Sequence, residues 1–233
     1  MGQFRKYYTT VTSLTYAFPP RNTIIGIIAA ILGLERDSYY DQFSRDKAKV
    51  GLQILSPVRK ISFSTNYLDT DQLSYGRFRG ESMVPTRVEY VMGLRDGLLR
   101  YRVFLEHKDA QLLETLKNKI RGKKSHYPLS LGPANCLASL NGFEDMDVEV
   151  LHLDNEGEFE VVTVMRQDQI RLDPSKNKGR RIMVEERAPP DFRRNRLPAS
   201  KSINYVYEAD CKPLTVSLRG DVFKVAGGYG TFM

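Results

Sequence analysis

Four residues in a short stretch could do chemistry on a phosphate ester: Lys123, Lys124, His126 and Tyr127. A histidine can act as general base toward a ribose 2′-hydroxyl, while a lysine stabilises the charge that develops on the phosphate. His126, with Lys124 and Tyr127, is therefore the candidate centre of a metal-independent ribonuclease. The alternative is a solvated basic loop after a helix, and we favour it because lysines are mostly found exposed.

The strong signatures of known enzyme classes are missing from the sequence. It contains no GxxxxGK[ST] or GxGxxG phosphate loop, no HExxH zinc helix and no GxSxG nucleophile turn. Its histidines, His107, His126 and His152, lack the spacing of metal ligands, and Cys136 and Cys211 are single and far apart. We therefore predict no metal, no cofactor and two buried thiols in a reducing compartment.

Basic residues outnumber acidic ones, and the formal net charge of the 233-residue chain is +7. This balance favours an acidic or polyanionic partner. The excess is concentrated in residues 176–201, which contain nine Lys or Arg and three Asp or Glu. Three prolines, Pro189, Pro190 and Pro198, predict that this segment is mostly irregular. Residues 1–6 lack the apolar core of a signal peptide, so we expect a cytoplasmic protein.

The amino-terminal segment 3–17 mixes basic, aromatic and hydroxyl side chains. Arg5 and Lys6 could neutralise phosphates, and Tyr7 beside them could stack on a base. These three residues are our first candidates for contact with nucleic acid. An extended, β-prone surface segment without any ligand explains the same composition equally well.

Residues 18–34 form the most apolar run of the chain and predict the helix around which the rest is organised. Small residues recur in it at helical spacing, namely Gly26, Ala29, Ala30 and Gly33. A Pro-Pro pair imposes an extended approach, after which Asn22 or Thr23 could cap the first free amides. The run is shorter than the roughly 20 apolar residues of a membrane span, so we expect a buried core helix.

A long polar excursion follows a predicted strand at residues 49–55. Residues 57–88 are too polar for a core and contain several cations, namely Arg59, Lys60, Arg77, Arg79 and Arg87. Aromatic residues are interspersed with them. We expect a projecting hairpin or an ordered loop, and excursions of this length are more often functional than not.

The middle of the chain carries clear local signals. Strands are predicted at residues 88–94 and 98–105, joined as a hairpin through Asp96 and Gly97. Asp109 is expected to cap a second helix that ends at Gly122, with leucines on one face and charged residues on the other. This order of elements predicts an α+β fold with helices on one face of a largely antiparallel sheet.

The remainder of the chain is predicted to be rich in β-structure. Residues 148–153 and 159–165 are expected to flank a hairpin turn at 154–157, and further strands are expected at 202–207 and 214–218. The glycine-rich tail around Gly227 to Gly230 is predicted to be flexible, or else to allow a close approach of backbones.

Two motifs, in order, resemble the CRISPR-associated Cas family five proteins. The first is GQFR at residues 2–5 followed by FPPRNTIIG at 18–26 and ILGL at 31–34, and the second is the glycine-containing turn YPLSLGPANC at 127–136. The similarity covers about residues 2–140. The isoleucine-rich helix and its FPPRNT start look most like the subtype I-B members.

The resemblance implies a ferredoxin-like, RRM-related fold of the repeat-associated mysterious protein superfamily. Residues 1–128 would form this domain, with a thumb at about 57–88, and residues 129–233 a β-rich carboxyl-terminal part. Family members have a first strand before the segment that corresponds to Gly2, and this strand is absent from the chain as given. We therefore expect either a start upstream of Met1 or another segment in the place of this strand.

The same resemblance implies a non-catalytic, RNA-binding subunit of a type I Cascade surveillance complex in antiviral defence. Such a subunit holds the 5′ handle of the crRNA and contacts the backbone subunit and the large subunit, with target DNA nearby. Candidate RNA contacts are Arg5, Lys6, Tyr7, Arg21, Asn22, Thr23, Gly132 and Asn135. Here the amino-terminal end of the core helix would receive phosphates.

Two alternative functions remain at this level. Subtype I-C relatives cut precursor crRNA themselves with tyrosine, lysine and histidine, and a metal-independent endoribonuclease with His126, Lys124 and Tyr127 is one alternative for this chain. A basic protein-interaction module that touches nucleic acid only incidentally is the other. It differs from the first two in predicting no preference for a handle sequence.

Overall fold

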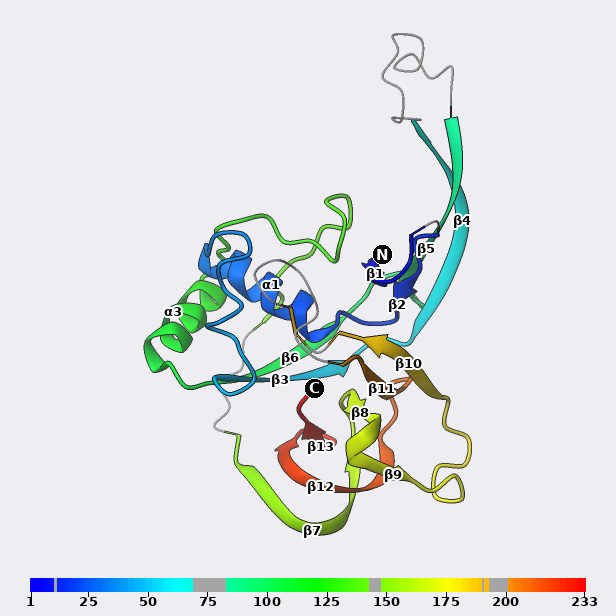
Figure 1. Ribbon diagram of the computed structural model, residues 1–233. Coiled ribbons are helices and arrows are strands. Elements are labelled where there is room, and N and C mark those ends of the chain that lie inside the picture. Colours follow the sequence, from blue (N-terminus) through cyan, green and yellow to red (C-terminus); the bar gives the residue numbers. More distant parts are fainter. Residues whose placement is uncertain (11, 69–82, 143–147, 190, 193–200) are drawn as a thin grey trace.

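Strands make up most of the secondary structure, and two helices lie side by side over the strands of the amino-terminal half (Figure 1). The computed structural model describes residues 1–10, 12–68, 83–142, 148–189, 191–192 and 201–233. Its elements are β1 (Phe4–Arg5), β2 (Thr15–Tyr16), α1 (Arg21–Leu32), β3 (Ala48–Ile54), β4 (Val58–Leu68), β5 (Met83–Gly93), β6 (Tyr101–His107), α3 (Ala110–Arg121), β7 (Val150–Val161), β8 (Met165–Arg166), the 3₁₀ turn η1 (Gln167–Gln169), β9 (Ile170–Leu172), β10 (Ile182–Ala188), β11 (Ile203–Glu208), β12 (Leu214–Val225) and β13 (Gly228–Thr231).

Helix α1 is the buried core helix that the sequence predicts. Its buried side chains include Ile24, Ile25, Ile28 and Ile31, which join the main hydrophobic core. The expected cap by Asn22 or Thr23 is wrong. Pro20 is the N-cap, and its carbonyl accepts the amides of Thr23 and Ile24 at 2.8 and 3.1 Å. A proline suits this place because its fixed φ matches a helix start.

Strand β3 lies between the two halves of the molecule. It pairs antiparallel with β6 over its whole length, from Ala48↔His107 to Ile54↔Tyr101. Its residues are almost continuously buried, since the helices cover one face and the carboxyl-terminal strands cover the other. On that second side a Cβ on Gly51 would meet the ring of Phe223 at 2.9 Å. No described strand pairs with the other edge of β6.

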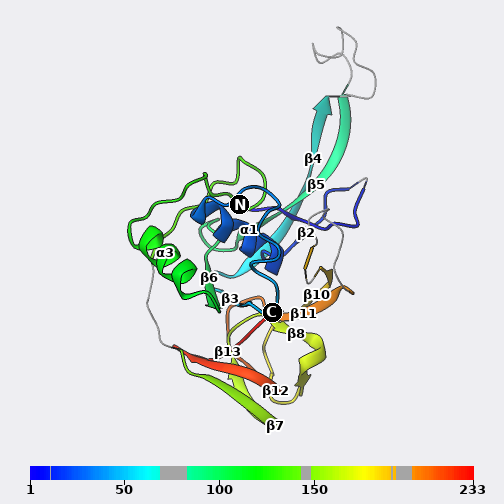
Figure 2. The ribbon, with the colours of Figure 1, turned by 60° about the vertical axis from the view of Figure 1, so that its left-hand side comes forward.

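The described residues of the excursion at 57–88 form a projecting hairpin, which was one of the two expectations for it, the other being an ordered loop. Strands β4 and β5 pair from Val58↔Gly93 to Leu68↔Met83 and extend away from the body in both views (Figures 1 and 2). Arg77 and Arg79 lie outside the described residues. The rings of Phe63 and Tyr90 stack on the hairpin, with centroids 5.4 Å apart.

The predicted hairpin through Asp96 and Gly97 is wrong in its pairing. The turn forms, with Gly97 at φ +73°, but the strands on either side of it diverge. Strand β5 pairs with β4, and β6 pairs with β3. The local turn signal was sound, whereas the choice of strand partner depends on tertiary packing. The second helix is confirmed, since Asp109 Oδ1 accepts the amides of Gln111 and Leu112 at 2.9 and 3.0 Å.

The carboxyl-terminal part forms a four-stranded sheet of β13, β7, β12 and β9 and a three-stranded sheet of β10, β11 and β8. The hairpin expected at 154–157 is wrong, because β7 runs unbroken from Val150 to Val161 beside the equally long β12. Part of the basic segment is also more ordered than expected, because residues 182–188 form β10 against β11.

The glycine-rich tail is not a flexible end but approaches neighbouring groups closely, which is the second of the two expectations for it. Strand β13 pairs with β12, and a Cβ on Gly230 would lie 2.3 Å from the ring of Phe223. The main core also includes Tyr205, Tyr207 and Met233, so residues from both halves of the chain share it. Within the described part of the chain, no helix is long and apolar enough to cross a membrane.

Candidate nucleic-acid interface

The two motifs that resemble the Cas family meet in space. The amide of Gln3 donates to the carbonyl of Leu131 at 2.9 Å, so the turn of the second motif lies directly on the amino-terminal segment of the first. Gly132 has φ +101°, and a Cβ there would lie 1.9 Å from the carbonyl oxygen of Gln3. A side chain at this position would collide with the backbone of Gln3, so the packing of the protein itself requires glycine here.

The turn itself is held by its own backbone. Leu131 donates to Cys136, and Ala138 to Leu129, at 2.7 and 2.9 Å. Asn135 lies exposed at its outer side, and Cys136 is buried beneath it. Cys136 and Cys211 are both free thiols, as predicted, although Cys211 is only partly buried. The outer side of the turn presents polar groups next to β1 in a fixed conformation.

A group of aromatic and basic side chains, all exposed except the half-buried Phe192, lies at the end of β1 and after it, and we call it the aromatic-basic surface. Its members are Arg5, Tyr7, Tyr8, Arg187 and Phe192. Tyr7 and Tyr8 are 45% and 38% exposed, and their rings meet edge to face at 5.4 Å. The guanidinium of Arg187 lies 5.5 Å from the ring centre of Tyr8, and Phe192 contacts Tyr7 at 6.4 Å.

This surface can hold a single-stranded nucleic acid. Exposed rings in a fixed relative orientation offer faces on which bases stack, and the arginines between them can neutralise phosphates. The sequence predicted Arg5 and Tyr7. It missed Tyr8, Arg187 and Phe192, although Tyr8 is adjacent to a predicted residue and the other two belong to the basic segment 176–201. Their approach to Tyr7 depends on a contact between distant parts of the chain.

Lys6, which the sequence placed among the RNA contacts, points the other way. Its ammonium pairs with Glu185 at 3.2 Å, and its side chain is only 14% exposed. The same buried carboxylate pairs with Lys60 at the base of the hairpin and accepts the amide of Ala17. Glu185 thus ties the amino-terminal segment and the hairpin to β10, and both lysines serve the fold.

Arg21 is the most deeply buried of the predicted contacts. Its side chain is 1% exposed, and its Nη2 donates to the carbonyls of Phe43 and Ala48, both at 2.8 Å. Its Nη1 pairs with Asp191. Burial lowers the pKa of this guanidinium below its ordinary value. These bonds hold the Arg21 side chain inside the protein in this conformation.

Asn22 and Thr23, in the first turn of α1, are both half-buried, and the side-chain nitrogen of Asn22 has no hydrogen-bond partner among the described residues.

The described thumb residues differ from one another. Arg59 and Arg87 are exposed on β4 and β5, whereas Lys60 is held by Glu185. Arg59 and Arg87 therefore remain open to a partner.

The residues of the ribonuclease alternative lie on an exposed loop. His126, Lys124 and Tyr127 are all exposed, and the backbone amides of His126 and Tyr127 donate to the carbonyls of Ile31 and Ala30 at the end of α1. The imidazole covers Gly33, where a Cβ would lie 2.7 Å from its Cγ, and its ring meets that of Tyr127 edge to face at 4.6 Å. These contacts pin the loop to the helix.

Comparison with known proteins agrees with the two motifs. The family model described as CRISPR-associated protein (Cas_Cas5) matches residues 1–207. A search of curated proteins gave no match. Among solved structures, a chain of a "CRISPR RNA-guided surveillance complex" is similar in fold, with a TM-score of 0.50 and 14% identity, over 93% of this chain and 87% of that one. Because the family model spans most of the sequence, the chain belongs to the Cas5 family of CRISPR-associated proteins.

Proposed function

We propose that this chain is a non-catalytic, RNA-binding subunit of a type I Cascade surveillance complex, in which it caps the 5′ handle of the crRNA. Family membership supports the assignment to CRISPR defence. The single observation that carries the RNA site is the aromatic-basic surface, which extends from the end of β1, while the turn at residues 129–138 docks on Gln3 just before β1. The proposal includes a ferredoxin-like fold for the amino-terminal part and membership of subtype I-B.

In this proposal one or two handle bases stack on Tyr7 and Tyr8, while Arg5 and Arg187 neutralise neighbouring phosphates. Base stacking on an aromatic side chain contributes about 1–3 kcal/mol per base. Asn135, exposed on the adjacent turn, offers hydrogen-bonding groups to a base edge.

The projecting hairpin supplies the protein contacts of this proposal. Its outer strands carry exposed apolar and basic side chains together, including Phe63, Tyr67, Met83, Arg59 and Arg87. Such a mixture is typical of surfaces that pack against another protein and an anionic strand. We therefore assign the hairpin, as the thumb, to the neighbouring backbone subunit, and the large subunit to the surface near the handle.

Binding of labelled RNA, followed by fluorescence anisotropy, tests the handle site. We expect the full chain to prefer RNA with the handle sequence over a scrambled RNA of equal length. Tyr7→Ala should weaken handle binding at least fivefold, because one stacked base is lost. Arg5→Gln should reduce the slope of log affinity against log salt by about 0.7, the value for one phosphate contact on a single strand.

Arg36→Gln is the matched control, because Arg36 is 79% exposed and lies after α1, away from β1. It should leave the preference and the slope unchanged. Equal affinity for the handle and scrambled RNAs would reject the handle site and favour a basic protein-interaction module.

Incubation of the pure chain with repeat RNA in EDTA tests the cleavage alternative. We expect intact RNA, since the ring of His126 makes no hydrogen bond to another described side chain that would orient it as a base. Site-specific cleavage that disappears in His126→Ala would instead establish the chain as a processing ribonuclease.

A further inference from the structure

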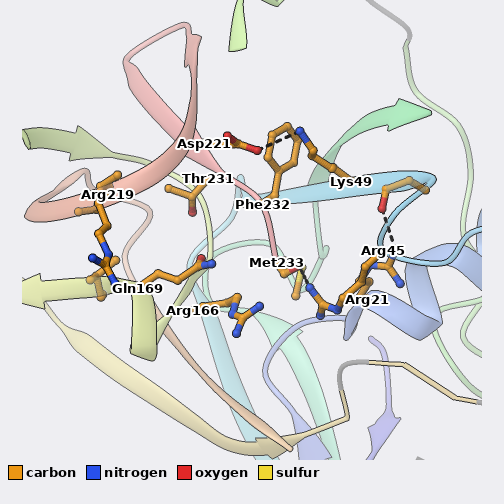
Figure 3. Close-up of a pocket in the computed structure, with 13 residues that line it drawn as sticks. Arg21, Arg45, Lys49, Arg166, Gln169, Arg219, Asp221, Thr231, Phe232 and Met233 are labelled. Atoms are coloured by element: carbon orange, nitrogen blue, oxygen red, sulfur yellow. Dashed lines mark hydrogen bonds and ion pairs between the residues drawn. The ribbon is translucent and has the colours of Figure 1, made fainter. Parts of the chain in front are cut away.

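A basic pocket of about 200 Å³ lies between the start of α1 and the carboxyl-terminal sheet, separate from the aromatic-basic surface (Figure 3). About 15 Å³ of such space is enough for one water molecule, so a cavity of this volume can hold a group of several atoms. The cations that line the pocket come from five different segments of the chain: Arg21, Arg45, Lys49, Arg166 and Arg219.

Positive charge dominates the wall of the pocket. Five Lys or Arg line it, together with the side-chain carboxylate of Asp221 and the last residue of the chain, Met233. In Figure 3 the guanidinium groups of Arg45, Arg21 and Arg166 gather on one side, and Arg219 lies opposite, near Gln169. Arg219 is exposed and forms no ion pair with any described residue. The guanidinium groups thus face a shared space from two sides.

Within the described residues, four of the five cations pair with carboxylates of the protein, and the fifth, Arg219, does not. Lys49 pairs with Asp221 and Glu106, and Arg166 pairs with Asp168. Arg21 and Arg45 share one carboxylate, Asp191, which Arg45 Nε reaches at 3.1 Å. Arg45 Nη1 also donates to the main-chain oxygen of Met233, the last residue, at 2.8 Å. Arg219, which has no ion pair among the described residues, is therefore the pocket cation that can meet a further anion without giving up a carboxylate.

A buried hydroxyl lies next to the same arginines. Tyr205 is fully buried, and its hydroxyl lies within hydrogen-bonding reach of Arg45. Burial raises the pKa of this phenol, and the nearby charges of Arg45, Arg166 and Arg21 oppose the rise. Since the phenol oxygen can accept from the Arg45 guanidinium, these two groups support each other behind the pocket.

We propose that this pocket binds a phosphate group of a single-stranded nucleic acid, as a second contact beyond the handle site. Arginine forks match the geometry of phosphate oxygens, and a ring at the pocket, Phe232, gives an apolar surface for the adjoining sugar or base. Residues 191–192 connect the two sites, since Asp191 holds the pocket arginines while Phe192 contacts Tyr7. The two sites are therefore linked through adjacent residues of the chain.

The test compares Arg219→Gln with Arg171→Gln in the full chain. Arg171 is 79% exposed on β9, pairs with Glu156 and does not line the pocket, so its loss matches the charge change. Binding of labelled single-stranded RNA and DNA of equal length is measured as a function of salt. We expect Arg219→Gln to weaken binding several-fold and to reduce the salt slope by about 0.7, and Arg171→Gln to change neither.

Arg166→Gln in combination with Arg219→Gln should reduce the slope again, and thermal melts of both variants check that the fold is retained. A larger loss with RNA than with DNA identifies the strand as RNA, and the reverse identifies DNA. Inorganic phosphate should raise the melting temperature of the native chain more than that of the double variant.

Unchanged affinity and slope with both nucleic acids in folded Arg219→Gln would overturn the proposal, as would binding of an acidic peptide alone. This result is distinguishable from failure of the proposed function. Loss of handle preference is read from the ratio of handle to scrambled RNA, whereas the pocket is read from the salt slope on any sequence.

Discussion

Two sets of cations contain the same residue types but lie in opposite surroundings. One set belongs to the aromatic-basic surface, and the other lies around Asp191 and Glu185. Arg5 and Arg187 are exposed beside tyrosines, while Arg21, Lys6 and Lys60 are held by buried or half-buried carboxylates. The first set can exchange water for phosphate at little cost, whereas the second set is already used by the fold. Residue type alone therefore does not identify an RNA contact in a basic chain.

The largest expected effect separates the two sets through stability. Arg21→Ala leaves the carbonyls of Phe43 and Ala48 without their donor and leaves Asp191 with Arg45 as its remaining partner. Loss of one partner of a buried pair costs about 3–5 kcal/mol, and we expect the melting temperature to fall by about 10 °C. Arg36→Ala, at an exposed site, should change it by less than 2 °C.

Thermal unfolding followed by circular dichroism measures both variants of this pair. If Arg21→Ala melted like the native chain but lost affinity for handle RNA, Arg21 would belong with the binding cations, and the distinction between the two sets would fail.

A pair of glycines gives a smaller effect that sharpens the role of the docked turn. Both Gly132 and Gly179 have positive φ, but a Cβ meets the Gln3 carbonyl only at Gly132, and nothing lies within 4 Å at Gly179. Gly179→Ala should cost about 1 kcal/mol from backbone strain, and Gly132→Ala about 2–3 kcal/mol because the turn must also move.

Urea unfolding gives the free energies of this comparison, and anisotropy gives the handle affinity. Handle affinity should fall in Gly132→Ala and stay unchanged in Gly179→Ala. Equal costs in the two variants would mean that the turn yields freely and does not shape the interface.

The smallest expected effect depends on pH and lies at an exposed ion pair near the basic pocket. A hydrogen bond from His152 to Asp221, at 2.7 Å, raises the pKa of the imidazole above its ordinary 6.5. Because the folded-state pKa is the higher one, this contribution to stability is complete below about pH 6.5 and is lost as the pH rises through the folded-state value.

Unfolding free energies at several pH values between about 5 and 8 check this behaviour in native chain and His152→Gln. The difference between them should shrink toward the alkaline end. His126→Gln is the control, since His126 is exposed and pairs with no described carboxylate. A difference that grows with pH would contradict the assignment.

Local signals predicted the elements better than their pairing. Helix α3 follows from the Asp109 cap and the leucine spacing, and the projecting hairpin follows from its polarity. The turn through Asp96 and Gly97 was also real, yet its flanking strands chose other partners. A turn is decided by a few residues, whereas strand pairing depends on which faces the helices and the second sheet cover.

The candidate site was predictable only where it is local. Arg5 and Tyr7 could be found from composition, because they lie together near the amino terminus. The burial of Arg21 depends on Asp191, which is 170 residues away. The basic pocket combines single residues from five segments, and no spacing in the sequence brings them together.

Photocrosslinking tests the central claim most directly. Handle RNA carrying 4-thiouridine is bound by the full chain, irradiated and mapped to residues by mass spectrometry. We predict crosslinks at Tyr7, Tyr8 and the turn at residues 129–138, and their loss when scrambled RNA is used. Crosslinks confined to the loop around His126 and Tyr127, or equal in yield for both RNAs, would contradict the assignment of the aromatic-basic surface as the handle site.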